Sequence, residues 1–140
     1  MFTHPMSTHP IKRRLLLLAI GLAGLAACSK EELAIDPNHP LLGTWVQAGY
    51  EGNTIIYTRA SRLKDDGYGL IFQADGQLVM RQVAGWCGTP PLVYANYEGR
   101  WNLSGSTLQT TMHYQWMPSA TKQTSQVISV DGKRLVLAYQ

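Results

Sequence analysis

The chain has 140 residues, of which 45% are hydrophobic and 15% are charged, with a formal net charge of +3. That excess comes from Lys12, Arg13 and Arg14, because basic and acidic residues are equal in number from Cys28 onward. This balance excludes the basic surface of a nucleic-acid-binding protein, and the length from Cys28 suits one domain.

The first predicted element is a cleaved targeting segment over residues 1–27. The basic residues Lys12–Arg14 precede Leu15–Ala27, a run of thirteen apolar or small residues without charge. A membrane-crossing helix needs about 20 apolar residues, so this run is too short to span a bilayer. A basic region before a short apolar stretch is typical of a secretory signal peptide, with translation starting at Met1 or at Met6.

The small residues that end this segment are followed at once by a cysteine, in the order Leu25-Ala26-Ala27-Cys28. This pattern resembles the lipobox of bacterial lipoproteins. The resemblance implies that Cys28 is lipidated, becomes the first residue of the mature chain and anchors it in the outer membrane, on the periplasmic or the cell-surface side. Stable attachment needs at least two acyl chains, which a diacylated cysteine supplies. The alternative is a plain signal peptide followed by an unmodified cysteine.

Residues 28–40 are expected to form the lipidated N-terminus and a short tether, because Ser29–Pro40 is polar and rich in turn residues. A short turn is predicted at Asp36–Leu41. A lipid on Cys28 would leave Cys87, the second of the two cysteines, without a disulfide partner. We interpret Cys87 as a small hydrophobic residue, with a reactive thiol as the alternative.

From Leu41 onward the hydrophobic pattern has a period of two, which predicts strands. In Val93–Leu103 one face is apolar and the other polar, as is typical of antiparallel sheets. The pairs Asp75-Gly76 and Asp131-Gly132 predict tight hairpin turns. Eight strands are predicted, near residues 43–50, 54–61, 68–74, 77–84, 93–103, 107–116, 123–130 and 134–139.

Eight short strands without a helical segment predict an all-β domain over residues 41–140. The expected architecture is a small up-and-down antiparallel β-barrel of about eight strands, because closure removes the free edges of a sheet. A β-sandwich is the alternative, since the number of strands does not separate the two.

Gly43-Thr44-Trp45 opens the first predicted strand and resembles the Gly-x-Trp signature of lipocalins. The stretch GLIFQADGQLVMRQ also resembles a hairpin of bacterial lipocalin-like lipoproteins, and the resemblance covers residues 41–139. It implies that Trp45 closes the barrel floor and that an arginine near the last strand packs over it through a cation–π contact. Arg134 is the residue expected in that role. The Thr-Asp-Tyr element of larger lipocalins is absent from this sequence.

An eight-stranded barrel either fills with its own side chains or encloses one small molecule. The first interpretation is a pocket for a small hydrophobic ligand, lined by inward-facing residues of the predicted strands: Tyr97, Trp101, Met112, Tyr114 and Trp116. The alternative is a filled barrel that serves as a structural or protein-interaction module of the cell envelope.

The segment Gly85–Pro91 predicts a stiff loop at the end of the barrel, because Pro90-Pro91 restricts the backbone. The functional interpretation is a rim loop that contacts a partner through four residues: Trp86, Cys87, Pro90 and Pro91. The alternative is that Trp86 folds inward and caps the core.

No pattern in the sequence predicts catalysis or metal binding. His39 and His113 have no neighbouring residue at the spacing of metal ligands, and Asp65-Asp66 before Gly67 is a turn signal. We therefore expect no enzyme activity, no metal, no cofactor and no nucleic-acid partner. The expected partners are the membrane and a small hydrophobic ligand, with the oligomeric state left open.

Overall fold

The computed structural model describes residues 35–85 and 89–140. The chain divides into two compact units, Met1–Lys30 and Glu31–Gln140, and all described residues belong to the second. The predicted signal peptide, the lipidation site Cys28, and the loop residues Trp86 and Cys87 therefore lie outside the described residues.

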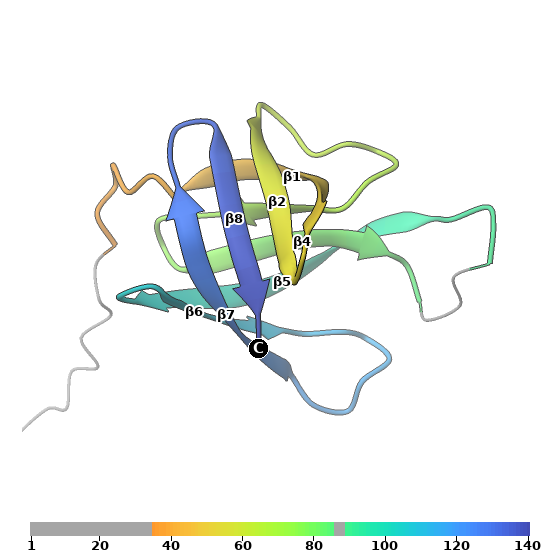
Figure 1. Ribbon diagram of the computed structural model, residues 1–140. Helices are drawn as coiled ribbons and strands as arrows, with labels where there is room; N and C mark the ends of the chain where they lie inside the picture. The colour runs from red at the N-terminus through yellow and green to blue at the C-terminus, as the bar shows by residue number, and fades with distance from the viewer. Residues whose placement is uncertain (1–34, 86–88) are drawn as a thin grey trace, which may run out of the picture. The chain divides into compact units, whose positions relative to one another are not determined.

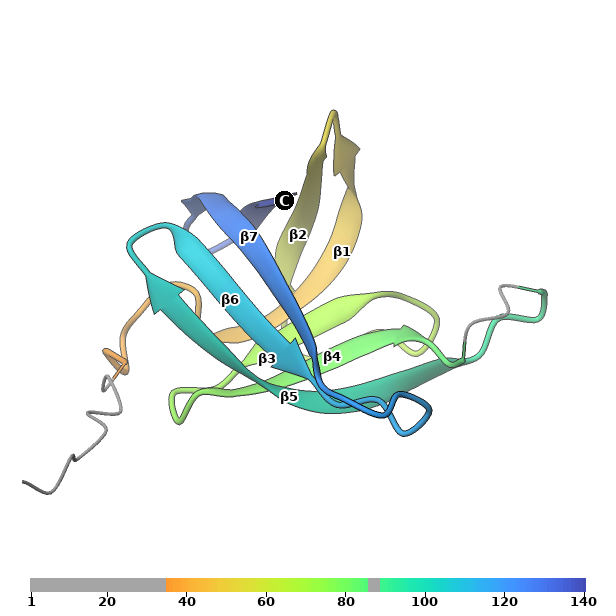
Figure 2. The ribbon, with the colours of Figure 1, turned by 90° about the horizontal axis from the view of Figure 1, so that it is seen from below.

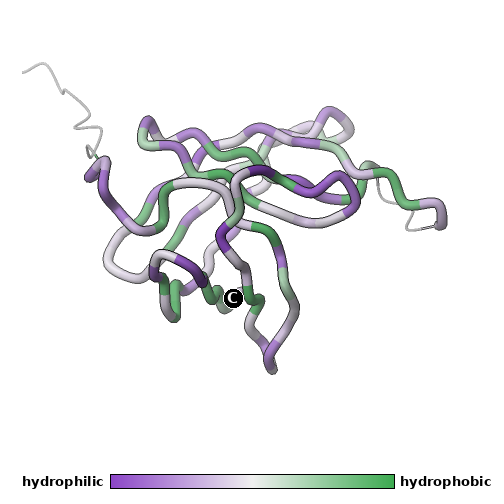
Figure 3. The backbone as a smooth tube through the Cα atoms, turned by 90° about the horizontal axis from the view of Figure 1, so that it is seen from above, coloured by the Kyte–Doolittle hydropathy of each residue, from purple (hydrophilic) through white to green (hydrophobic). Residues whose placement is uncertain are grey.

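The second unit is a closed barrel of eight antiparallel strands (Figure 1). Hydrophobic and hydrophilic segments are interspersed along the backbone of the barrel (Figure 3). The all-β barrel is thus confirmed in place of the sandwich. The strands are β1 (Gly43–Glu51), β2 (Thr54–Ala60), β3 (Gly69–Phe72), β4 (Gln77–Val83), β5 (Tyr94–Ser104), β6 (Thr107–Met112), β7 (Thr121–Val130) and β8 (Arg134–Tyr139).

The closed barrel departs from the predicted up-and-down succession of strands at one place. Strands β3 to β8 are neighbours in chain order, whereas β1 lies between β2 and β3. Strands β2 and β3 run in the same direction, because each of them pairs antiparallel with β1. The connection 61–68 therefore returns from the level of Thr44 to that of Gln47, where the Gln47 N–H donates to the Tyr68 carbonyl at 2.9 Å.

Every strand connection except 61–68, which returns along the barrel, lies at one of its two ends, because the strands that it joins are antiparallel neighbours. Residues 35–42 and the β3–β4, β5–β6 and β7–β8 turns lie at one end, which we call the floor end. The β1–β2, β4–β5 and β6–β7 connections lie at the opposite end, the mouth end (Figure 2).

The floor end holds the densest part of the core. Trp45 is 0% exposed and donates from Nε1 to the Leu41 carbonyl at 2.8 Å. Phe72 and Trp101 meet edge to face with ring centroids 5.3 Å apart, a favoured aromatic geometry. The buried hydrophobic cluster comprises Leu41, Trp45, Tyr57, Leu70, Phe72, Leu78, Trp101, Leu108, Met112, Leu135 and Leu137.

The segment before β1 packs onto this floor. Ile35 contacts the core cluster, and the His39 N–H donates to the Asp36 carbonyl at 2.9 Å. This turn confirms the prediction at Asp36–Leu41. The end of the predicted tether is thus part of the folded domain, because an apolar side chain and a turn attach it to the barrel.

The β3–β4 hairpin has the turn chemistry predicted from Asp75-Gly76. Gly76 has a φ of 82°, a left-handed conformation that glycine adopts without steric cost, and the Gln77 N–H donates to Asp75 Oδ1 at 3.0 Å.

Strand β6 is shorter than its prediction over residues 107–116. It ends at Met112, the last residue paired with both β5 and β7. Beyond it the Met117 N–H donates to the Tyr114 carbonyl at 3.0 Å, which makes a turn toward β7. The alternating pattern continues through Trp116, but the local turn takes the backbone out of the ladder.

Candidate functional site

The floor of the barrel is sealed by an arginine stacked on a tryptophan. The guanidinium carbon of Arg59 lies 4.2 Å from the centroid of the Trp45 ring. Its Nη1 donates to the Leu42 carbonyl at 2.7 Å. Its other nitrogens donate to the carbonyls of Gly132, at 2.9 Å, and of Pro40. Arg59 therefore joins the N-terminal segment, β2 and the β7–β8 turn beneath Trp45.

The prediction that Arg134 stacks on Trp45 is wrong. Arg134 is 49% exposed in its side chain, and its Nη2 lies 3.3 Å from Glu51 Oε1. Arg59 takes the place over Trp45 because the two residues are direct cross-strand partners in the β1–β2 ladder. A β-bulge between Gln47 and Gly49 shifts this register by one residue, and Gly49 within the strand is typical of such a bulge.

Toward the mouth end the packed interior opens into a cavity of about 250 Å³, which we call the mouth cavity. Strand β3 is short, so β1 and β4 have no strand between them above Gly69. The cavity lies beside this gap. Its lining includes apolar side chains of Ile55, Leu70 and Met80, the amides of Gln47, Gln82 and Gln123, and four tyrosines, Tyr50, Tyr57, Tyr68 and Tyr139.

Two of the tyrosines form a hydroxyl pair in the wall of the mouth cavity. The hydroxyl oxygens of Tyr57 and Tyr139 are 3.0 Å apart, and either can donate. Burial raises the pKa of Tyr57 far above its ordinary value, and the Tyr139 phenol acts in the same direction. Burial also raises the pKa of Tyr139. Both groups are therefore neutral phenols over the physiological pH range.

One charged residue, Arg81, borders the mouth cavity within the described part of the chain. Its guanidinium donates to Asn96 Oδ1 at 2.8 Å and to the Asp65 carbonyl at 2.7 Å. Its Nε is buried without a hydrogen-bond partner among the described residues. Arg81 alternates along β4 with Met80 and Gln82, and it fastens the 61–68 connection to β5.

The five residues predicted to line one ligand pocket are not gathered around the mouth cavity. Trp101 and Met112 are buried in the core cluster, and the Trp101 Nε1 donates to the Gln73 carbonyl at 3.0 Å. The other three form an aromatic cluster beside the mouth, with centroids 5.1 Å apart for each pair: Tyr97, Tyr114 and Trp116. Trp116 is 47% exposed, because it lies in the turn beyond β6.

The mouth-cavity residues were readable from strand alternation. Gln47 shares the parity of Trp45, Gln82 that of Met80, and Tyr57 that of Ile55, so each faces inward on its strand. The predicted ligand pocket does not include the glutamines, because a period-two pattern assigns polar residues to the outer face of a sheet.

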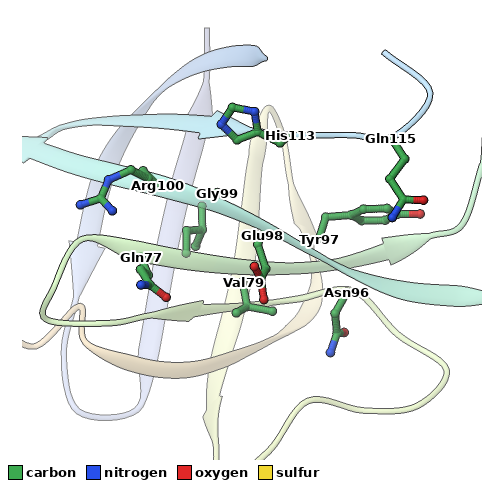
Figure 4. A pocket seen from close by; sticks show the side chains of 10 residues that line it. Gln77, Val79, Asn96, Tyr97, Glu98, Gly99, Arg100, His113 and Gln115 are labelled. Atoms are coloured by element: carbon green, nitrogen blue, oxygen red, sulfur yellow. The ribbon is translucent and has the colours of Figure 1, made fainter. Parts of the chain in front are cut away.

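A second hollow, the outer groove, lies over β4, β5 and the segment after β6, with a volume of about 530 Å³. Figure 4 shows His113 and Gln115 from that segment, and the Glu98 carboxylate extending toward its cross-strand partner Val79. Arg100, which also lines the groove, donates to the Asp75 carbonyl at 3.1 Å. The groove is polar and lies on the outside of the barrel.

The residues predicted for the rim loop divide between described and undescribed positions. Pro90 and Pro91 are exposed in the β4–β5 connection and are joined by a cis peptide bond, whereas Trp86 and Cys87 lie outside the described residues.

Residues 35–85 and 89–140 hold no group of three or more His, Cys, Asp or Glu side chains suited to a metal ion. The same residues include no helix with the length and apolar character to cross a membrane.

Comparison of the chain with protein-family models, with curated proteins and with solved structures found no match.

Proposed function

We propose that this chain is a lipid-anchored protein of the bacterial outer membrane with a lipocalin-like barrel that binds a small hydrophobic ligand. The observation that supports ligand binding is the mouth cavity. It combines an apolar surface from Ile55, Leu70 and Met80 with a few hydrogen-bonding groups, which is the usual composition of a small-molecule site. The packed floor beneath it supplies a rigid base.

The anchor is proposed from the sequence alone, on the lipobox that ends at Cys28. Replacement of this residue, Cys28→Ala, should release the protein from the membrane fraction and abolish palmitate labelling. A Cys87→Ala variant is the matched control and should remain in the membrane. Retention and labelling of the Cys28→Ala protein would overturn the anchor without bearing on the cavity.

Ligand binding is tested by filling the cavity. Ile55 lines it, whereas Ile128 on β7 is an exposed residue of the same type. Native mass spectrometry of the protein purified from its own cells should detect a bound small molecule. Ile55→Phe should abolish that adduct, whereas Ile128→Phe should retain it. An adduct that survives in both variants, or its absence from the unmodified protein together with failure to bind any of a panel of lipophiles, would reject the mouth cavity as the site.

A second candidate function, protein interaction, is supported by the apolar side chains exposed at the mouth end. Val93 is 64% exposed, and Leu92, Trp116 and Met117 are also exposed large hydrophobic residues of the β4–β5 and β6–β7 connections. A photo-crosslinking residue in place of Trp116 should then yield a discrete protein adduct in cells, and one in place of Ile128 should not. Equal labelling from both positions would reject this candidate.

A further inference from the structure

The hydroxyl pair in the mouth cavity has one hydrogen-bond donor more than it uses. Each phenol carries one O–H, and a single bond joins Tyr57 to Tyr139. Whichever hydroxyl donates, the other retains a proton that needs an acceptor. The spare proton lies either on Tyr57, which is 4% exposed, or on Tyr139, which is partly buried, and buried donors in proteins almost always have partners. A bound molecule with a carbonyl or ether oxygen would supply the missing acceptor.

The ionic character of the cavity sets a second requirement. No carboxylate of the described residues lines it, so a cationic ligand would lose its hydration there without a counter-ion. Arg81 is the one bordering cation among the described residues, and it leaves β4 on the face opposite to Met80 and Gln82. Two of its guanidinium nitrogens are bonded to Asn96 and to the Asp65 carbonyl, and its Nε is buried without a partner among the described residues. An unpaired charge buried in such a site is costly. The cavity therefore favours an uncharged ligand.

Size sets a third requirement. At about 250 Å³ the cavity is below the range of roughly 300–1,000 Å³ typical of drug-sized ligands. Its polar groups lie among apolar surfaces, including Leu70 and Met80. A compact body of about one ring, carrying one polar group, matches these dimensions.

We propose that the mouth cavity selects an uncharged, ring-sized molecule that carries a hydrogen-bond acceptor, and that the Tyr57–Tyr139 pair donates to this acceptor. This inference rests on the proposed function, since it names the class of ligand for the same cavity. It distinguishes the site from one for fatty acids or other carboxylates, and the two glutamines Gln47 and Gln123 offer further amide contacts at the cavity wall.

Three probes of the same ring separate these requirements: acetophenone, ethylbenzene and benzoate. In ligand-observed NMR titrations of the purified full-length protein, acetophenone should bind at least about tenfold more tightly than benzoate, because the one bordering guanidinium, that of Arg81, extends from the opposite face of β4 and leaves a bound carboxylate unpaired. It should bind about fivefold more tightly than ethylbenzene, the gain of one neutral hydrogen bond.

Variants identify the donor. A single Tyr→Phe change leaves one hydroxyl able to donate, so the double variant Tyr57→Phe/Tyr139→Phe is required. It should bind acetophenone and ethylbenzene equally, while still binding both. Tyr94→Phe is the matched control, because Tyr94 does not line the cavity, although its ring meets that of the cavity residue Tyr68 edge to face. The control should keep the preference for acetophenone.

The outcomes separate the inference from the proposed function. If benzoate binds as tightly as acetophenone, the inference is overturned, but the cavity remains a ligand site. Loss of benzoate binding in Arg81→Gln would then show that the guanidinium binds the carboxylate. An acetophenone preference that persists in the double variant would also overturn it. Failure of all three rings to bind the unmodified protein would overturn the cavity as a ligand site.

Discussion

The two ends of this barrel differ in how completely side chains fill the interior. At the floor end Trp45 is fully buried, and Arg59 bonds to three backbone carbonyls beneath it. At the mouth end, polar and aromatic side chains surround a cavity, and one phenol proton of the hydroxyl pair is left over. The floor end is therefore expected to carry the stability of the fold, and the mouth end its recognition.

The largest effect should follow from removing the floor tryptophan. Trp45→Ala deletes the largest fully buried side chain of the described residues and should lower the free energy of unfolding by about 3–5 kcal/mol. Urea unfolding followed by circular dichroism measures this loss. A loss under about 1 kcal/mol would contradict the assignment of stability to the floor end.

The next effect compares two arginines. Arg59→Met removes the stacking on Trp45 and leaves backbone carbonyls without their donors, so it should cost about 2–3 kcal/mol. Arg134→Met breaks an exposed ion pair with Glu51 and should cost less than about 1 kcal/mol. Urea unfolding measures both losses. Equal losses of unfolding free energy in the two variants would contradict the assignment of the floor role to Arg59 rather than Arg134.

A smaller effect is a dependence of stability on alkaline pH. The pKa values of Tyr57 and Tyr139 are raised in the folded protein, so the unfolded chain releases these protons first. Their stabilising contribution is complete below the ordinary tyrosine pKa of about 10 and is lost as the pH rises above it. Each group should contribute about 1.4 kcal/mol per pH unit in that range.

Denaturant unfolding at a series of pH values above about 9 measures this slope. The double variant Tyr57→Phe/Tyr139→Phe should show a much shallower fall in stability, because the buried phenols are gone. The Tyr94→Phe control should keep the slope of the unmodified protein. An unchanged slope in the double variant would show that other groups control the alkaline transition.

The smallest effect is expected at the exposed rim. Trp116 stacks on Tyr114 with an interplanar angle of 24° but remains 47% exposed. Trp116→Ala should therefore lower the free energy of unfolding by only about 1 kcal/mol. Thermal unfolding measures this change, and a loss comparable to that of Trp45→Ala would make the rim part of the stabilising core.

Period-two patterns and turn residues predicted all eight strands, because each signal is local in the chain. They did not predict that β1 lies between β2 and β3, since alternation identifies the buried face of a strand but not its neighbours. The exchange of Arg134 for Arg59 has the same origin. The partner of Trp45 depends on a register that a bulge between Gln47 and Gly49 alters, and this is a property of the paired strands.

The candidate site was predictable to a different degree. Large aromatic residues at inward positions correctly indicated where the core lies, as Trp101 shows. They did not indicate the cavity, because a cavity is where side chains fail to fill the interior. Its position follows from the short length of β3 and from the 61–68 connection. Tyr114 and Trp116 lie outside strand β6, contrary to the prediction, because the chain makes a four-residue turn from Tyr114 to Met117.

The attachment of the N-terminal segment to the floor end gives the barrel a polarity. Ile35 packs on the core, and seven peptide bonds separate it from Cys28, a reach of at most about 25 Å. Under the proposed anchor, the floor end can lie no farther than this length of chain from the lipid on Cys28.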